Sequence, residues 1–398
     1  MLKNYIGKYN KNKIKLQWKY LTENVYLHPL KNKIMKAGIV GLPNVGKSTL
    51  FNCLSNAKAQ SANFPFCTIE PNIGVVNVPD SRLEKLEELV NPERVLPATV
   101  EIVDIAGLVK GASKGEGLGN QFLGNIRETD AILHVIRCFD DDNVIHVDGS
   151  IDPIRDKETI DIELQLKDLE TAEKKMEKVK RAARTGEKEA QKEEVALQKV
   201  IKGLESSISV RAIDLTERER EEYINQMQFI TDKPVLYVCN VDDAAAATGN
   251  DYVEKVKAAV ANENAEVIFL AVGTEADINE LEEYEERQMF LEDLGLEEPG
   301  AAKLIRSAYK LLNLQTYFTA GVKEVRAWTI HEGFTAPQAA GVIHTDFEKG
   351  FIRAEVIKYD DFVSFGSEAK VKEAGKLSVE GKDYIVQDGD VMHFRFNV

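Results

Sequence analysis

The sequence predicts an α/β fold whose central sheet is built from parallel strands. Short apolar runs that are typical of buried strands alternate with helical segments from Met35 to about residue 311. A glycine-rich loop joins the first of these strands to the first helix. Hydrophobic residues make up 43% and charged residues 29% of the 398 residues, as in a globular protein of about two to three domains. No apolar run approaches the roughly 20 residues of a membrane-spanning helix.

The alternation of strands and helices defines the expected nucleotide-binding part of the chain. The expected strands are Ala37–Val40, Gly74–Val78, Thr99–Val103, Ala131–Arg137, Val235–Cys239 and Glu266–Ala271. The expected helices are Lys47–Ala57, Ser81–Val90, Gly119–Thr129 and Asp251–Glu263. Such an order favours a parallel sheet covered by helices on both faces, and we assign residues 35–154 and 233–311 to this domain.

Two other segments have different patterns. Residues 155–232 are rich in Glu, Lys, Ala and Leu, with apolar positions at helical spacing and a break at Arg184–Gly186, which predicts an inserted helical hairpin. After Leu311, short apolar runs and glycine turns predict a separate small α+β domain over 312–398. The expected strands there are Val322–Ile330, Gly341–Ile343, Phe351–Ile357 and Tyr384–Val386.

The glycine-rich loop Gly41–Thr49 has the sequence Gly-Leu-Pro-Asn-Val-Gly-Lys-Ser-Thr. Strand, glycine loop and helix is the context of a phosphate-binding loop. The glycines let the backbone curl so that its N–H groups face an anion, and the helix N-terminus adds partial positive charge. We therefore predict that Lys47 reaches the β- and γ-phosphates and that Ser48 binds Mg²⁺. The residues expected to bind nucleotide here are Asn44, Val45, Gly46, Lys47, Ser48 and Thr49.

Two further motifs indicate a nucleotide-controlled switch. Asp104 stands at the end of a predicted strand, where an aspartate can hold Mg²⁺, and Gly107 follows three residues later, where its N–H can reach the γ-phosphate. Thr68, between the first helix and the second strand, is the expected Mg²⁺-binding threonine of a first switch. Binding and loss of the γ-phosphate would then hold and release these loops.

The base would be read by Asn240-Val-Asp-Asp243, which follows a buried strand. A guanine reader has the pattern Asn-Lys-x-Asp; here Asn240 and Asp243 fit, but Val241 replaces the lysine. The residues therefore leave adenine and guanine both open. Leu108 stands where small GTPases carry the glutamine that positions water, so another group or a partner must assist hydrolysis.

The first 34 residues are basic, with eight lysines and one acid, whereas the whole chain has a net charge of −15. We expect a disordered leader, or sequence upstream of the mature fold, with contact to RNA as the alternative. The acidic remainder argues against nucleic-acid binding over the whole surface. The four cysteines form no metal or disulfide pattern, which favours the reducing cytoplasm.

From about Met35 onward the chain resembles the YchF family, the Obg-like ATPases of the translation-factor branch of P-loop GTPases. The motifs that carry this resemblance are the glycine loop, Asn63–Pro71, Asp104–Gly119, Leu314–Gly321, Arg326–Thr329 and His344–Gly350. The resemblance implies a P-loop NTPase of the Ras-like G-domain type, an inserted α-helical hairpin and a C-terminal TGS domain of β-grasp fold.

The same resemblance implies a cytoplasmic, Mg²⁺-dependent ATPase that prefers ATP and binds the ribosome, with RNA contacts through the hairpin and the TGS domain, and no membrane. It also implies that His146 is the catalytic histidine. The family's base-reading pattern is Asn-x-x-Glu, and Asp243 departs from it. A GTPase with the same switch role remains an alternative, as does a nucleic-acid-binding protein whose nucleotide site is only regulatory.

Overall fold

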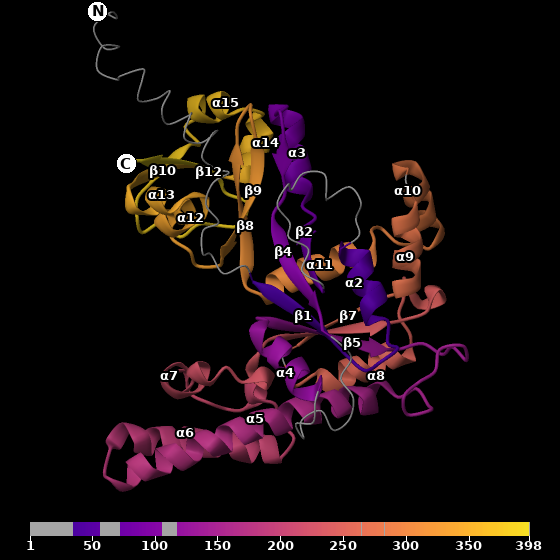
Figure 1. Ribbon diagram of the computed structural model, residues 1–398. Helices are drawn as coiled ribbons and strands as arrows, with labels where there is room; N and C mark the ends of the chain where they lie inside the picture. Colours follow the sequence, from indigo (N-terminus) through magenta and orange to yellow (C-terminus); the bar gives the residue numbers. More distant parts are fainter. Residues whose placement is uncertain (1–34, 56–71, 106–117, 264, 282, 398) are drawn as a thin grey trace, which may run out of the picture. The chain divides into compact units, whose positions relative to one another are not determined.

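The structure is a computed structural model that describes residues 35–55, 72–105, 118–263, 265–281 and 283–397 (Figure 1). The described chain divides into two compact units. The first contains residues 35–79 and 99–313, and the second contains residues 80–98 together with residues 314–397. The predicted leader, residues 1–34, lies outside the described residues.

The first unit is organised around a six-stranded sheet with the strand order β2-β4-β1-β5-β6-β7. Its strands are β1 (Lys36–Val40), β2 (Ile73–Asn77), β4 (Thr99–Asp104), β5 (Ala131–Arg137), β6 (Val235–Asn240) and β7 (Glu266–Leu270). All neighbouring strands are parallel except β2 and β4, which pair antiparallel. Every residue of β5 and β6 is buried, which explains their continuous apolar runs. The six predicted strands are thus confirmed, but the sheet is mixed rather than purely parallel.

Helices connect and cover these strands. They are α2 (Lys47–Ser55), α4 (Leu118–Glu128), α8 (Asp251–Val260), α9 (Val272–Glu280), α10 (Tyr284–Asp293) and α11 (Gly300–Leu311). Helix α2 contacts α9 and α11, and α11 also contacts β5, β6 and β7. Helix α9, which no sequence pattern predicted, begins where β7 ends, and its first residue lies beside the phosphate-binding loop.

A long helical hairpin is inserted in the chain between β5 and β6, which are neighbours in the sheet (Figure 1). It consists of α5 (Pro153–Arg184) and α6 (Lys188–Glu205). Asp152 caps α5 by accepting hydrogen bonds from two backbone N–H groups, and a proline occupies the first turn, where its missing N–H costs nothing. Five short helical turns lead from α6 to β6: η4 (Val210–Ala212), α7 (Glu217–Glu219), η5 (Arg220–Ile224), η6 (Asn225–Met227) and η7 (Ile230–Asp232). A further turn, η8 (Asp243–Ala245), follows β6.

Asp168 joins the hairpin to this returning chain. Its buried carboxylate accepts hydrogen bonds from the backbone N–H groups of Ile230 and Thr231 and from the Thr231 hydroxyl. Burial raises the pKa of Asp168 to about 6, against these hydrogen bonds. The base of the hairpin is therefore attached to η7 by a polar contact as well as by apolar packing.

The second unit contains a sheet with the order β11-β10-β12-β8-β9-β3. Its strands are β3 (Val95–Leu96), β8 (Leu314–Ala320), β9 (Val325–His331), β10 (Phe351–Ile357), β11 (Ser378–Glu380) and β12 (Val391–Phe396). Its helices are α3 (Ser81–Val90), α12 (Ala336–Ile343), α13 (Thr345–Lys349), α14 (Tyr359–Phe365) and α15 (Glu368–Glu373). An aromatic core that includes Tyr317, Trp328 and Phe394 holds α12 and α13 against the sheet.

Two expected strands of this unit, Gly341–Ile343 and Tyr384–Val386, are wrong. Gly341–Ile343 ends helix α12, which starts with a capping box between Thr335 and Gln338 and a proline in its first turn. Three residues are too few for the spacing of apolar positions to distinguish a strand from a helix. Tyr384–Val386 contributes only an isolated bridge, between Ile385 and Thr335.

The segment 80–98 packs with the C-terminal residues, although it lies between β2 and β4 in sequence. Helix α3 contacts β8, β9 and α14, and β3 pairs with β9. Arg82 forms an ion pair with Asp388 at 2.7 Å and lies over the ring of Phe318. The sequence pattern assigned this segment to the nucleotide-binding domain. Sequence order alone cannot reveal that a segment between two strands of one sheet packs with a different unit.

Candidate nucleotide-binding site

The phosphate-binding loop lies between β1 and α2 in the first unit. Its curl depends on three residues with positive φ: Gly41 (159°), Asn44 (62°) and Gly46 (96°). At Gly46 the φ value lies in the region that L-residues rarely adopt, and an added Cβ would stand 2.6 Å from Nδ2 of Asn240. Glycine is therefore required at this position for backbone conformation and for space.

Lys47 is buried beneath the loop, with 7% of the residue exposed. Its Nζ donates a hydrogen bond of 2.6 Å to the carbonyl oxygen of Leu42, so the side chain folds back over the loop. Burial lowers the pKa of Lys47 to about 8, and the Asp104 carboxylate opposes this shift. A desolvated amine at the start of a helix is well suited to a phosphate group, whose charge would restore the protonated form.

Ser48 and Asp104 meet at the mouth of the loop. The Ser48 hydroxyl donates to Oδ2 of Asp104 at 3.1 Å, although the two residues are 56 positions apart. The other carboxylate oxygen, Oδ1, is buried and has no hydrogen-bond partner among the described residues. Burial raises the pKa of Asp104, while Ser48 and Lys47 act against it. A hydroxyl and an unsatisfied carboxylate oxygen at one point are the donor types that Mg²⁺ prefers.

Asn240 links the loop to the far side of the site. Its Nδ2 donates to the carbonyl oxygen of Val45 at 3.0 Å, and its Oδ1 accepts from the backbone N–H of Val272 at 3.0 Å. The side chain is therefore used to join β6, the phosphate-binding loop and the start of α9. We conclude that Asn240 organises the site, whichever base is bound.

Val241 and Asp243 differ in exposure. Val241 is buried at 3% exposure, so it presents no side chain along the face of a base. Asp243 is exposed, and its Oδ1 accepts a hydrogen bond of 2.6 Å from the Thr274 hydroxyl. Thr274 was not anticipated, because no motif marks it and only the packing of α9 brings it to Asp243.

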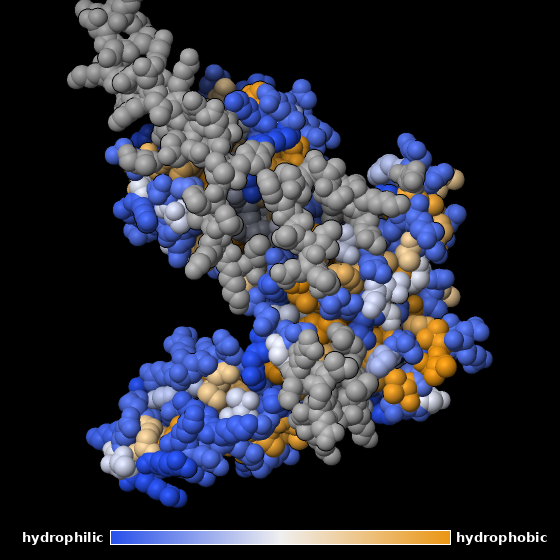
Figure 2. Space-filling view, viewed as in Figure 1, coloured by the Kyte–Doolittle hydropathy of each residue, from blue (hydrophilic) through white to orange (hydrophobic). Residues whose placement is uncertain are grey.

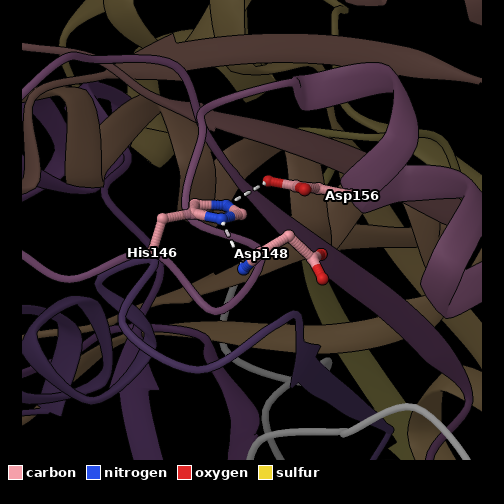
Figure 3. A group of neighbouring side chains, drawn as sticks. All are labelled: His146, Asp148 and Asp156. Atoms are coloured by element: carbon pink, nitrogen blue, oxygen red, sulfur yellow. Dashed lines mark hydrogen bonds and ion pairs between the residues drawn. The ribbon is translucent and has the colours of Figure 1, made fainter.

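His146 lies in the loop between β5 and α5, and its ring is hydrogen-bonded on both sides (Figure 3). Nε2 is 2.7 Å from Oδ2 of Asp156, and Nδ1 accepts from the backbone N–H of Asp148 at 3.1 Å. The imidazole is turned inward, with 6% of its side chain exposed. The imidazole is therefore hydrogen-bonded to a residue in the first turn of α5, Asp156.

Arg137 and Asn44 support the loop of residues 138–152 that carries His146, called the histidine loop below. The buried guanidinium of Arg137 donates to the carbonyl oxygens of residues 139, 141 and 144. Asn44 of the phosphate-binding loop donates from Nδ2 to the carbonyl oxygen of Ile145 at 3.2 Å. Neither role could be predicted from the sequence, because the partners are backbone carbonyls that no side-chain pattern reveals.

The structure thus brings Lys47, Ser48, Asp104 and Asn240 into one region around the loop, with Thr49 exposed on the first turn of α2. Thr68 and Gly107, the predicted first-switch threonine and the predicted γ-phosphate contact, lie outside the described residues, as does Leu108.

A cavity of about 440 Å³ lies within the second unit. Its lining combines aromatic side chains such as Trp328 and Phe362 with charged ones such as Glu355 and Lys323. None of the predicted nucleotide-binding residues lines it, and it is not part of the site described above.

Comparison with known proteins agrees with this architecture. A family model described as "50S ribosome-binding GTPase" matches residues 36–175. A second, the YchF-GTPase C-terminal model described as "Protein of unknown function (DUF933)", matches residues 314–397. Two curated relatives named "Ribosome-binding ATPase YchF" are similar over nearly their whole length. The protein of Haemophilus ducreyi is 58% identical over 363 residues, covering 91% of this chain and 99% of the relative. That of Bacillus subtilis is 55% identical over 366 residues, covering 92% and 100%.

This chain belongs to the YchF family. The resemblance inferred from the motifs is confirmed, and so is the fold, a P-loop GTPase domain with a C-terminal domain. The solved structure of the Schizosaccharomyces pombe YchF GTPase superposes with a TM-score of 0.83 at 39% identity, covering 92% of this chain and 99% of that one. In this YchF protein, none of the described helices has the length and apolarity needed to cross a membrane.

Proposed function

We propose that this protein is a Mg²⁺-dependent ATPase that converts ATP to ADP and phosphate and acts as a nucleotide-controlled switch on the ribosome. The observation that carries the proposal is the convergence of the buried Lys47 amine with the Ser48–Asp104 pair at one loop. Membership of a family whose relatives are named ribosome-binding ATPases supports the same activity.

The residues present fit a magnesium ion. Ser48 and Asp104 supply hard oxygen donors, and the buried Oδ1 of Asp104 lacks a hydrogen-bond partner among the described residues. Thr68 is proposed as a further ligand. When bound, the ion would neutralise charge on the β- and γ-phosphates. The protein's own part is to bind the phosphates through Lys47 and the loop amides of residues 44–49, and to sense the γ-phosphate through the N–H of Gly107.

Hydrolysis needs a group that orients the attacking water. Leu108 has no polar atom for this purpose, so we assign the role to His146, whose loop is joined to the phosphate-binding loop through Asn44. Since phosphoryl transfer depends mainly on positioning and charge, a poorly placed water gives slow turnover. We therefore expect basal turnover well below the roughly 1–100 s⁻¹ of kinases.

ATP is the proposed substrate, with GTP as the alternative. Val241 is buried and lacks the ammonium and long stem of the guanine reader's lysine. Asp243 is the residue that a guanine reader uses, but the Thr274 hydroxyl already occupies part of its hydrogen-bonding capacity. Asn240, Val241 and Asp243 remain the residues proposed to surround the base, with Asp243 the one whose side chain is exposed.

The tip of the helical hairpin is the proposed RNA contact. Five exposed cations lie within residues 178–188, and none of them forms an ion pair with another residue that the structure describes: Lys178, Lys180, Arg181, Arg184 and Lys188. The hairpin surface over α5 and α6 is predominantly hydrophilic in Figure 2. A local cationic tip on a chain of net charge −15 favours a phosphate backbone as partner. We propose the C-terminal unit, as a TGS domain, as a second contact, and the cytoplasm as the place of action.

Two measurements on the full chain test this proposal. Phosphate release from ATP and from GTP is compared with Mg²⁺ and with EDTA, and co-sedimentation with ribosomes is measured with ADP and with a non-hydrolysable ATP analogue. We expect Mg²⁺-dependent ATP hydrolysis and nucleotide-dependent sedimentation. Nucleotide-dependent sedimentation without any turnover would instead favour the regulatory nucleic-acid-binding alternative.

A further inference from the structure

In the histidine loop two apolar side chains are exposed, whereas the polar ring between them is buried. Ile145 and Val147 are apolar, yet 78% and 52% of them are exposed. The imidazole of His146 between them is almost completely buried. Burial of a polar ring while its apolar neighbours face solvent requires a specific polar partner inside. That partner is Asp156, as Figure 3 shows.

Both ring nitrogens of His146 are in use. Because Nδ1 accepts from the Asp148 N–H, the ring proton must be on Nε2, where it is donated to the Asp156 carboxylate. No lone pair or proton remains to orient a water molecule. Although the three side chains are close enough to share a metal ion, the Asp148 carboxylate is directed away from the ring (Figure 3), and the ring is already satisfied.

Asp156 is itself held in place. Arg155 donates from Nη2 to its Oδ1 at 3.0 Å, so one oxygen faces the guanidinium and the other faces the imidazole. Asp156 also belongs to the first turn of α5, whose far end is the tip of the hairpin. On the other side, the histidine loop is attached to the phosphate-binding loop through Asn44 and Ile145. His146 thus lies at a junction between the hairpin and the nucleotide site.

We propose that Asp156 is a positioning residue that withholds His146 from the reaction until the first turn of α5 and the histidine loop separate. A partner bound at the hairpin would then increase turnover by releasing a histidine that is already in the site. This inference rests on the catalytic role proposed above for His146. It differs from that role in assigning a restraining function to Asp156.

The test is steady-state ATP hydrolysis by the full chain with substitutions at Asp156. Asp156→Ala removes the acceptor, and we expect kcat to rise roughly tenfold, as expected when a charge-assisted hydrogen bond no longer restrains the competent form. KM and nucleotide affinity should stay nearly unchanged. Asp156→Asn keeps a neutral acceptor, so a smaller rise is expected.

Asp148→Ala is the matched control, because it removes a neighbouring carboxylate while leaving the backbone N–H that bonds to Nδ1. Its turnover should remain near that of the parent. The double variant His146→Ala/Asp156→Ala should fall to the level of His146→Ala, because the gain depends on the released ring. Histidine ¹⁵N spectra of the ligand-free parent should show the Nε2–H tautomer, and the Nε2–H proton should exchange faster with water in Asp156→Ala, where its carboxylate acceptor is gone.

Several outcomes would overturn the inference. If His146→Ala lowers turnover but Asp156→Ala fails to raise it, Asp156 supports the working position instead of withholding the ring. If the gain persists without His146, Asp156 acts elsewhere. Parent-like turnover in the single His146→Ala variant would remove His146 from the mechanism and the restraint with it. If the alanine variant does not fold, two other results would overturn the inference: turnover of Asp156→Asn no higher than that of the parent, or a parent spectrum that lacks the Nε2–H tautomer.

Discussion

The Ser48 hydroxyl donates a hydrogen bond to Oδ2 of Asp104 across 3.1 Å and joins the start of α2 to the end of β4. Parallel strands place their carboxyl ends at one edge of the sheet, and β1 and β4 are direct neighbours. Two residues that are far apart in sequence therefore meet beside the phosphate-binding loop. The proposed chemistry of the site can be tested at this pair and at Lys47.

Substituting Ser48 or Asp104, the proposed magnesium ligands, should change the Mg²⁺ concentration that hydrolysis requires. Ser48→Ala and Asp104→Asn are each expected to raise the Mg²⁺ concentration for half-maximal ATP hydrolysis by roughly tenfold or more, since each removes one oxygen ligand or its charge. The Mg²⁺ titration of turnover measures this. Thr274→Ala, which alters a hydroxyl at the other end of the site, serves as the control. An unchanged Mg²⁺ titration in both variants would exclude this pair as the metal site.

Lys47→Ala should weaken triphosphate binding without unfolding the protein. Among the described residues the amine donates only to the Leu42 carbonyl, so its loss should affect the ligand more than the core. We expect affinity for ATP to fall by roughly 10- to 100-fold, with a nearly unchanged melting temperature. Lys257→Ala, at an exposed pair on α8, is the control. Hydrolysis at the parent rate by Lys47→Ala would place the site elsewhere.

The lowered pKa of Lys47, about 8, predicts a pH dependence of nucleotide binding. Above this pH the free amine is increasingly neutral, whereas phosphate binding favours the protonated form, so ATP affinity should decrease as the pH rises beyond about 8. Binding near that pH should take up protons. Calorimetry in buffers of different ionisation enthalpy measures the uptake.

Lys47→Arg provides the control for this pH dependence, because a guanidinium stays charged throughout the range. The proton uptake assigned to Lys47 should disappear in this variant. Uptake of the same size in Lys47→Arg and in the parent would show that another group titrates.

Adenine should be preferred over guanine at the base site. The buried Val241 offers no packing along the base, and the Asp243 carboxylate accepts from Thr274. Titrations of ATP, GTP, ADP and GDP under one set of conditions measure the preference. Asp243→Ala should leave ATP affinity within about threefold, the size of a weak neutral hydrogen bond. Tighter GTP binding in the parent, abolished by Asp243→Ala, would establish the GTPase alternative.

Neutralising the hairpin tip should weaken ribosome binding but not basal hydrolysis. Five cations of residues 178–188 form no ion pair with another described residue, and changing them to glutamine removes their proposed phosphate contacts. Co-sedimentation should therefore decrease and depend less on salt. The matched control changes three lysines of the same hairpin that pair with glutamates: Lys174, Lys192 and Lys199. Equal effects of both sets would indicate a general charge effect instead of a specific contact.

Much of the nucleotide-binding loop was predictable because its information is local. Nine consecutive residues contain the glycine, lysine and serine positions, and positive φ at Gly46 is a property of that stretch alone. The six strands of the first sheet could likewise be predicted, because buried parallel strands are continuous apolar runs. Their pairing directions could not: β2 runs antiparallel to β4, although the two apolar runs resemble their parallel neighbours.

Sequence by itself therefore determined the class of this protein, the position of its phosphate-binding loop and the types of ligand atoms available. Only the tertiary structure decided which partners those atoms meet. It placed residues 80–98 with the C-terminal unit, brought Thr274 to Asp243 and turned His146 toward Asp156. Backbone conformation in a short loop depends on the residues within it, whereas a hydrogen bond between distant elements depends on how the whole sheet and its helices pack.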